Sequence, residues 1–341
     1  MLNKPIRQKS LHGVRPTRRQ TRVANSVEHQ ARLAKRLTSR DKWIIRMVHE
    51  HRVLTAPQIT SCAFPSPRSG RQRMRELYQW SVLDRFQPTV DTGSAPQHYV
   101  LGPAGASVLA ADAGIDPKTL GYRRDRATSI AHSQRLAHAV GVGEFFTALI
   151  ARAHTHESEH VSAWWSEVRC ARHFGDLVRP DAYGRWRHDG REFEFFLEYD
   201  LGTETTGRVA AKLSGYARLA ASTGIVTPLL LWAPTARREA NLRTQLATAW
   251  RGLDHPEHLP IVTAAADLLD PDPEAHPSPA EAIWAPLAQG DDQRRALHNL
   301  AAAWPQRPRT RPSPQPEHRS STEIVAPNPM PPAPTMSSTG R

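Results

Sequence analysis

Cysteine is scarce in this chain, with only Cys62 and Cys170 among 341 residues. Both stand alone in apolar or strand-like surroundings, so they provide neither a disulfide framework nor a metal-binding pair. A reducing, cytoplasmic setting is therefore the simplest expectation. The sequence also lacks an apolar run near the ~18 residues that a membrane-spanning helix needs. No hydrophobic stretch follows the basic N-terminus, so we expect no secretory signal.

Acidic residues are outnumbered, with 33 Asp and Glu against 45 Lys and Arg, for a net charge of +12. This balance favours a polyanionic partner. Residues 1–40 alone hold eleven basic side chains and one acidic side chain. We therefore expect residues 1–37 to form an unfolded basic arm that adds phosphate contacts; a solvated tail without a role is the alternative.

Proline is concentrated near the C-terminus, where residues 270–341 hold 15 of the 29 prolines. Such a composition predicts a disordered tail, with one short helix around residues 291–303. Between the two tails, the pattern of apolar residues predicts two folded domains, at residues 38–120 and 127–268.

The first domain has the element order of a winged helix-turn-helix. Helices are predicted to start near Thr38, near Thr55 and at Ser66 or Ser69, the third ending near Trp80. Strands over residues 82–86 and 97–101 and a helix over 103–113 follow. This order is typical of DNA-binding domains that carry a β wing.

Three arginines of the predicted third helix, Arg68, Arg71 and Arg75, recur at helical spacing. They would face the major groove or its flanking phosphates in double-stranded DNA. A solvated basic face, or a winged helix used for protein contacts, is the alternative. Base-specific readout cannot be assigned from arginines alone.

The second domain reads as an α/β (mixed α+β) fold. Its predicted order is α-β-β-β-α-β-α-β. The helices are expected over residues 129–153, 203–221 and 236–250. The strands are expected over residues 163–170, 181–187, 193–200, 226–232 and 259–264. A turn at His188-Asp189-Gly190 joins the second and third strands.

Acidic side chains follow this predicted hairpin. Asp181 begins one strand, and Glu198 and Asp200 end the next. Carboxylates on adjacent strand ends can hold a divalent cation close to a phosphodiester. An arginine partner for Glu198 and a helix-capping role for Asp200 are the alternative.

Pro180-Asp181 and Glu198-x-Asp200 in this element order resemble the PD-(D/E)XK nuclease superfamily, over residues 130–265. The resemblance implies that Asp181 and Glu198 hold Mg²⁺ or Mn²⁺, and Glu144 matches an acidic residue that some members place in the leading helix. Asp200 would be a further oxygen ligand of the metal. A lysine normally follows the second acid by two residues, but Asp200 occupies that position here. Lys212, in the following helix, is the expected substitute.

Both domains together resemble the replication-relaxation family of actinobacterial plasmids and integrative elements. The resemblance covers nearly all of residues 37–232, and it is carried by 37–41 (Leu-Thr-Ser-Arg-Asp), 75–77 (Arg-Glu-Leu), 99–105 (Tyr-Val-Leu-Gly-Pro-Ala-Gly), 145–146 (Phe-Phe), 198–204 (Glu-Tyr-Asp-Leu-Gly-Thr-Glu) and 212–216 (Lys-Leu-Ser-Gly-Tyr). It implies a role in replication or relaxation of mobile-element DNA, with no defined reaction.

Two functions stay open. The chain is either a DNA-binding replication or maintenance factor with a structural second domain, or a metal-dependent endonuclease or nickase whose catalytic residues are Asp181, Glu198 and Lys212. Double-stranded DNA is the expected partner of both, together with a relaxase or replication proteins. No Ser/His/Asp or Cys/His nucleophile arrangement stands out.

Overall fold

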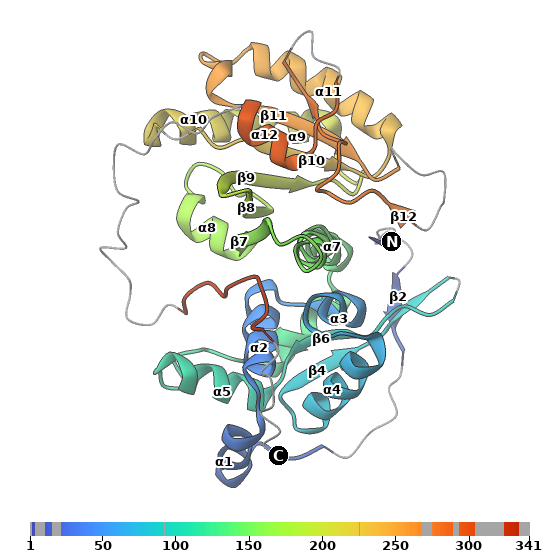
Figure 1. The fold of residues 1–341 in the computed structure, drawn as a ribbon, viewed down its shortest axis with the longest axis vertical. Helices are drawn as coiled ribbons and strands as arrows, with labels where there is room; N and C mark the ends of the chain where they lie inside the picture. Colours follow the sequence, from blue (N-terminus) through green and yellow to red (C-terminus); the bar gives the residue numbers. More distant parts are fainter. Residues whose placement is uncertain are drawn as a thin grey trace. The chain divides into compact units, whose positions relative to one another are not determined.

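Figure 1 shows the computed structural model of the chain, which describes residues 2–3, 11–15, 22–91, 93–224, 226–267, 275–288, 293–303 and 324–333. These residues divide into two compact units. Unit 1 comprises residues 1–8 and 140–319, and unit 2 comprises residues 9–139 and 320–341. Helices and sheets occur in both units, which confirms the mixed α/β class.

Unit 2 is built on helices that are capped by hydroxyl side chains. Its elements are β2 (Leu11–Val14), α1 (Val27–Arg36), α2 (Ser39–His51), β3 (Leu54–Thr55), α3 (Ala56–Ala63), α4 (Pro67–Gln79), β4 (Leu83–Phe86), β5 (Pro88–Val90), β6 (His98–Leu101), α5 (Pro103–Ala113), α6 (Arg124–Thr128) and a 3₁₀ helix, η2 (Ser129–His132). Thr38 and Thr55 form capping boxes at the starts of α2 and α3, and Ser66 caps α4. The predicted starts of these three helices are thereby confirmed.

The small sheet of unit 2 has the strand order β3-β6-β4, and its pairs are antiparallel. Beyond β4, the chain continues into β5, which pairs with the N-terminal strand β2. The expected strands near residues 82–86 and 97–101 are present as β4 and β6, and the chain between them forms a separate two-stranded sheet with β2 from the N-terminal segment.

The expectation of an unfolded arm over residues 1–37 is wrong for part of that segment. Helix α1 forms because Ser26 caps it and because one side is buried, with Leu33 at 1% exposure. His29 Nε2 also lies 2.7 Å from the carbonyl oxygen of Trp80. Long-range packing, rather than composition, decides the state of these residues. Residues 4–10 and 16–21 of the predicted arm lie outside the described residues.

Unit 1 is built around a mixed sheet with the strand order β13-β11-β10-β9-β8-β7. Neighbours are antiparallel from β7 to β9, parallel from β9 to β11, and antiparallel at β13. The elements are β1 (Leu2–Asn3), α7 (Leu136–Ala153, whose first residues belong to unit 2), β7 (Glu159–Ser166), α8 (Glu167–Phe174), β8 (Ala182–His188), β9 (Arg191–Tyr199), α9 (Thr206–Ala211), α10 (Leu213–Thr223), β10 (Leu229–Ala233), α11 (Ala236–Arg251), the 3₁₀ helix η3 (Pro256–His258), β11 (Ile261–Ala265), β12 (Ala275–His276), β13 (Ala285–Pro286) and α12 (Leu297–Ala303).

Alternating side chains of β9 separate two cores on the two faces of this sheet. Phe195 stacks with Phe146 of α7 on one face, and Phe196 contacts Tyr216 of α10 on the other. Among the described residues, α7 is the one helix with the length and hydropathy of a membrane span, but 67% of it is buried inside the structure. Gly141 permits its close approach, because a Cβ there would lie 2.3 Å from the Tyr199 ring.

Several local predictions for unit 1 need correction. The strand expected over residues 163–170 ends at Ser166, whose hydroxyl caps α8, so Cys170 is helical. The long helices expected over 129–153 and 203–221 are interrupted, the second at Lys212. The turn between β8 and β9 is confirmed, since Asp189 and Gly190 both have positive φ values, of 47° and 74°.

The proline-rich tail is also more ordered than predicted. Within residues 275–303, Ile283, Trp284, Leu297 and Leu300 are fully buried, and α12 lies in the range where a short helix was expected. Residues 324–333 belong to unit 2. The buried apolar side chains explain the difference, because proline content alone ignores them. The rest of the tail, including residues 304–323, lies outside the described residues.

Candidate functional site

The hairpin of β8 and β9 places Asp181 opposite Glu198. Ala182 pairs with Leu197 in the antiparallel register, so the residues just outside this pair face each other. Asp181 is fixed by a 2.8 Å hydrogen bond from the backbone N–H of Tyr199 to its Oδ2 atom. The two carboxylates therefore share one end of the hairpin, as predicted from the sequence.

Both oxygens of Glu198 are held by donors from the α9–α10 segment. Lys212 Nζ lies 2.5 Å from Oε2, and the hydroxyl of Tyr216 donates to Oε1 at 2.5 Å. The side chain of Glu198 is 5% exposed and that of Lys212 is 34% exposed. The structure thus brings Asp181, Glu198 and Lys212 together, and the role of Lys212 as a substitute lysine stays a prediction.

The break between α9 and α10 positions these donors. Lys212 ends α9 and precedes α10, and Tyr216 follows four residues later on the same side of the helix. Gly215 allows α10 to approach the segment before β8, because a Cβ at this position would lie 2.6 Å from the Leu177 carbonyl oxygen. A side chain at residue 215 would push the donors away from Glu198.

Burial and charge shift the protonation equilibria at this cluster. The pKa of Glu198 is raised to about 7, because burial and the negative charge of Asp181 outweigh the opposing effect of Lys212. Burial alone would lower the pKa of Lys212, but Glu198 and Asp181 raise it above its ordinary value. Burial and Glu198 also raise the pKa of Tyr216. Near neutral pH Glu198 can readily lose its proton, and its carboxylate would then be available to bind a cation.

Asp200 lies in a separate ion pair. Arg238 of α11 donates from Nε to Asp200 Oδ2 at 2.7 Å and from Nη2 to the Glu204 carbonyl at 2.6 Å. The backbone N–H of Gly202 donates to Asp200 Oδ1 at 2.9 Å. Asp200 therefore attaches the loop between β9 and α9 to α11. The helix-capping role named as the alternative is wrong, because Thr205 caps α9.

Glu144 acts on the other face of the sheet. Its negative charge, after burial, contributes to the raised pKa of Tyr199, whose side chain points away from Glu198 by the alternation of β9. Within the described residues, no three of the four predicted metal ligands come within 4.8 Å of one another. The arrangement offers Asp181 and Glu198 as a pair of oxygen ligands, with Asp200 and Glu144 apart from them.

Two residues of this region were missed by the sequence interpretation. Tyr216 could have been found from its position four residues after Lys212, which places both on one helix face. Arg238 gave no local signal, because its contact with Asp200 spans 38 residues.

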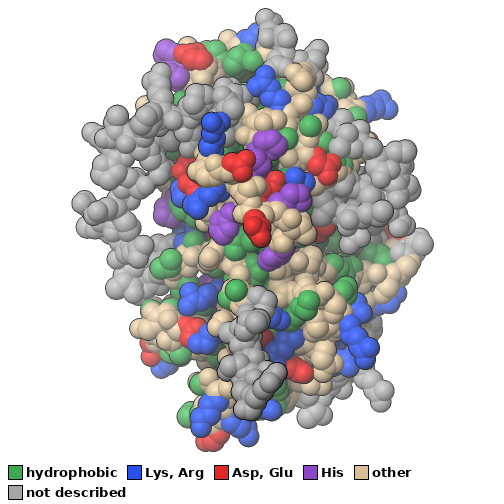
Figure 2. Space-filling view, in the orientation of Figure 1, with side chains coloured by type: hydrophobic (Ala, Val, Ile, Leu, Met, Phe, Trp, Pro, Cys, Tyr) green, Lys and Arg blue, Asp and Glu red, His purple; other side chains and the backbone are tan. Residues whose placement is uncertain are grey.

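Helix α4 of unit 2 presents the predicted basic face. Arg68, Arg71 and Arg75 are exposed, as is Gln72. On the face drawn in Figure 2, Lys and Arg side chains are interspersed with acidic and histidine side chains, so net charge alone marks no single patch there. The spacing of the three arginines on α4 is therefore a more specific sign of nucleic-acid binding than the net charge.

Packing fixes the opposite side of α4. Arg73 donates to Asp41 from Nε at 2.9 Å and from Nη2 at 2.6 Å, and it also pairs with Glu76. Gly70 contacts α3 so closely that a Cβ would lie 2.7 Å from Thr60 Oγ1. One arginine thus anchors the helix, which leaves the other three directed outward.

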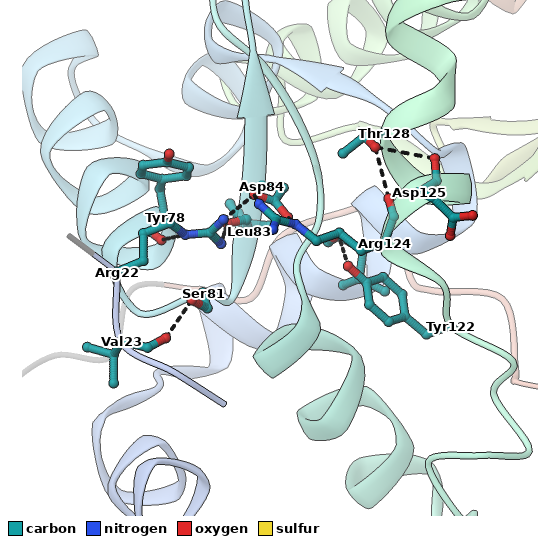
Figure 3. A network of polar contacts seen from close by, with 11 residues as sticks. Arg22, Val23, Tyr78, Ser81, Leu83, Asp84, Tyr122, Arg124, Asp125 and Thr128 are labelled. Atoms are coloured by element: carbon teal, nitrogen blue, oxygen red, sulfur yellow. Dashed lines mark hydrogen bonds and ion pairs between the residues drawn. The ribbon is translucent and has the colours of Figure 1, made fainter. Parts of the chain in front are cut away.

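A buried carboxylate, Asp84 of β4, joins three segments of unit 2 (Figure 3). Arg22 forms an ion pair with Asp84 Oδ1, and Arg124 of α6 donates from Nε to Oδ2 at 2.8 Å. The Tyr122 hydroxyl donates to the Leu101 carbonyl at 3.1 Å. The segments before α1 and after α5 are therefore both attached to the small sheet.

No curated protein and no solved structure matches this chain. Residues 45–229, more than half of the chain, match the family described as replication-relaxation. The match includes α4, Asp181, Glu198 and Lys212, and it shows that the chain belongs to the replication-relaxation family.

Proposed function

We propose that this protein binds double-stranded DNA of a plasmid or integrative element through unit 2 and acts in its replication, relaxation or maintenance. The observation that carries the proposal is the exposed arginine face of α4, at Arg68, Arg71 and Arg75. Arginines spaced three and four residues apart on one helix side can reach phosphates or guanine edges along a major groove.

The surrounding elements support this assignment. The order α2-β3-α3-α4-β4-β6 and the sheet order β3-β6-β4 are those of a winged helix-turn-helix domain, with α4 as its recognition helix. The β4–β6 hairpin would be the wing, and the β2–β5 pair lengthens it. The family assignment and the net charge of +12 point toward nucleic acid as the partner. A relaxase or a replication protein is the expected protein partner.

DNA binding is tested by fluorescence anisotropy with a labelled duplex. Arg71→Ala and Arg75→Ala should each weaken binding by about threefold to tenfold, as expected for the loss of a phosphate or base contact. Arg123→Ala is the matched control, because Arg123 is exposed outside α4 and pairs only locally with Asp125. Equal binding by wild type and a variant lacking all three α4 arginines would remove α4 from the interface.

A second function, metal-dependent DNA cleavage, is favoured by the position of Lys212 on Glu198. The antiparallel β7-β8-β9 meander followed by parallel β10 matches the core order of the PD-(D/E)XK superfamily. The carboxylate pair suits Mg²⁺ or Mn²⁺, which prefer oxygen ligands. When bound, such an ion polarises the phosphoryl group and lowers the pKa of a water.

The protein side chains would have distinct roles in that reaction. Asp181 and Glu198 would hold the cation, Tyr216 would keep Glu198 oriented, and Lys212 would orient the attacking water or stabilise developing charge. Lys212 and Tyr216 each occupy one Glu198 oxygen in the structure. Each Glu198 oxygen keeps a second lone pair, through which a cation could bind while Lys212 and Tyr216 stay in place.

Cleavage is tested by incubating the protein with supercoiled plasmid and Mg²⁺ or Mn²⁺. Wild type should nick the plasmid, Asp181→Ala and Glu198→Ala should abolish nicking, and Asp254→Ala, an exposed acid elsewhere in unit 1, should not. DNA binding without nicking, unchanged in the two site variants, would leave the non-cleaving function alone.

A further inference from the structure

The C-terminal segment Ile324–Ala333 lies against unit 2, far along the chain from its contact. Trp43 of α2 donates its indole N–H to the carbonyl oxygen of Asn328 at 2.9 Å, across 285 residues of sequence. Pro327 and Pro329, on either side of Asn328, are buried. In Figure 1 this segment is the dark red trace beside α2.

Trp43 lies on a broad buried face of α2. Met47 follows it by four residues on the same side of the helix, and the two side chains are 6% and 1% exposed. A buried indole N–H needs an acceptor, because an unsatisfied buried donor is costly. The carbonyl oxygen of Asn328 supplies that acceptor.

The chemistry of this contact is that of proline-rich peptide recognition. Residues 324–333 are assigned to neither helix nor strand. Proline-rich segments keep extended shapes without internal backbone hydrogen bonds, so their carbonyls are available to donors on a receptor surface. Proteins that bind proline-rich peptides commonly use aromatic side chains, which pack on the proline rings and can donate a hydrogen bond to a carbonyl between them. Trp43 can do both through one indole.

We propose that the Trp43 side of α2 is a docking site for an extended proline-rich peptide, with Pro327-Asn328-Pro329 as the recognised core, and that the chain's own residues 324–333 are its ligand. Twenty residues, 304–323, separate this ligand from Ala303 at the end of α12 in unit 1. The ligand is therefore covalently part of the chain that carries the site, and its binding competes with that of a free peptide of the same sequence.

The test uses the full-length chain and a fluorescein-labelled peptide of residues 324–333. Replacing Pro327→Ser and Pro329→Ser in the chain should free the site, so that the labelled peptide binds this variant saturably and at least about tenfold more tightly than it binds wild type. Adding Trp43→Phe should weaken this binding about fivefold, the change expected for one hydrogen bond. A peptide that carries the same two serines is the control ligand.

Two measurements make the outcome decisive. Circular dichroism must show that each variant remains folded, and hydrogen exchange at the Trp43 indole N–H, which donates to Asn328, should be slow in wild type and faster in the variant that carries Pro327→Ser and Pro329→Ser. Absence of peptide binding by the freed variant, or identical exchange in both chains, would overturn the proposal. Concentration-dependent dimers of wild type would assign the site to the tail of a second copy, which contradicts occupation by the chain's own tail.

Discussion

His98 of β6 is a histidine that the fold keeps neutral. It is 1% exposed, stacks on Phe86 with ring centroids 5.2 Å apart, and contacts the Pro96 carbonyl through Nδ1 at 2.9 Å. Burial lowers its pKa to about 4, and the Pro96 carbonyl only partly opposes this shift. The side chain therefore links the stability of unit 2 to pH.

The stability of unit 2 changes with pH because the folded and unfolded chains bind different numbers of protons at His98. Between pH 6.5 and 4 the unfolded chain binds a proton at His98 that the folded chain does not, so stability falls as pH falls through this window. We expect the free energy of unfolding of unit 2 to be about 2 kcal/mol lower at pH 5 than at pH 7.5 through His98 alone. Urea titrations at both pH values measure it.

His98→Asn provides the control for this prediction. An asparagine amide can still donate to the Pro96 carbonyl but does not titrate in this range. The variant should lose roughly 2 kcal/mol of the pH dependence between pH 5 and 7.5, whatever its stability at neutral pH. A pH profile that is the same in wild type and in His98→Asn would show that His98 is not the titrating group.

At the scale of elements, Gly215 lets α10 lie close enough for Lys212 and Tyr216 to donate hydrogen bonds to Glu198. Gly215→Ala would place a Cβ 2.6 Å from the Leu177 carbonyl oxygen. The backbone must shift, and we expect a loss of about 2 kcal/mol of stability together with displacement of Lys212 and Tyr216 from Glu198. Thermal unfolding measures the first effect, and the ionisation of Glu198, followed by carboxyl NMR, measures the second.

Gly207 of α9 is the matched control for Gly215. A Cβ at residue 207 meets nothing within 4 Å, and the position is helical. Gly207→Ala should raise stability by about 0.5 kcal/mol, because alanine loses less backbone entropy in a helix. If both alanine variants behaved alike, the close contact at Gly215 would not constrain α10.

Sequence patterns predicted the elements whose signals are local. The capping threonines of α2 and α3, the Asp189-Gly190 turn and the arginine spacing of α4 all act over a few residues. The closeness of Lys212 to Glu198 was expected from the resemblance to a nuclease superfamily, and its role there stays a prediction. Sequence patterns did not predict features that depend on contacts between distant segments. These features are the formation of α1, the helical state of Cys170 in α8, and the hydrogen bond from Trp43 to Asn328.

At the scale of the whole molecule, the proposed binding of DNA by this chain of net charge +12 should depend on salt concentration. Each phosphate neutralised by a cationic side chain contributes about 0.9 to the slope of log affinity against log salt concentration. Loss of Arg68, Arg71 and Arg75 together should therefore reduce this slope by roughly 3 if each contacts a phosphate. Anisotropy titrations at several salt concentrations measure the slope, and an unchanged slope would contradict phosphate contact by α4.

The attachment of Arg22 and Arg124 to one buried carboxylate changes the limits of the first domain. A fragment cut at residues 38 and 120, where the apolar pattern places the boundaries, would keep Asp84, which is 3% exposed in the full chain, and would lose both arginines that pair with it. A buried acid without its cationic partners destabilises a fold by several kcal/mol, or stays protonated. We therefore expect a fragment that starts before Arg22 and extends past Arg124 to be the more stable one, so that electrostatics rather than the ends of regular structure sets its limits.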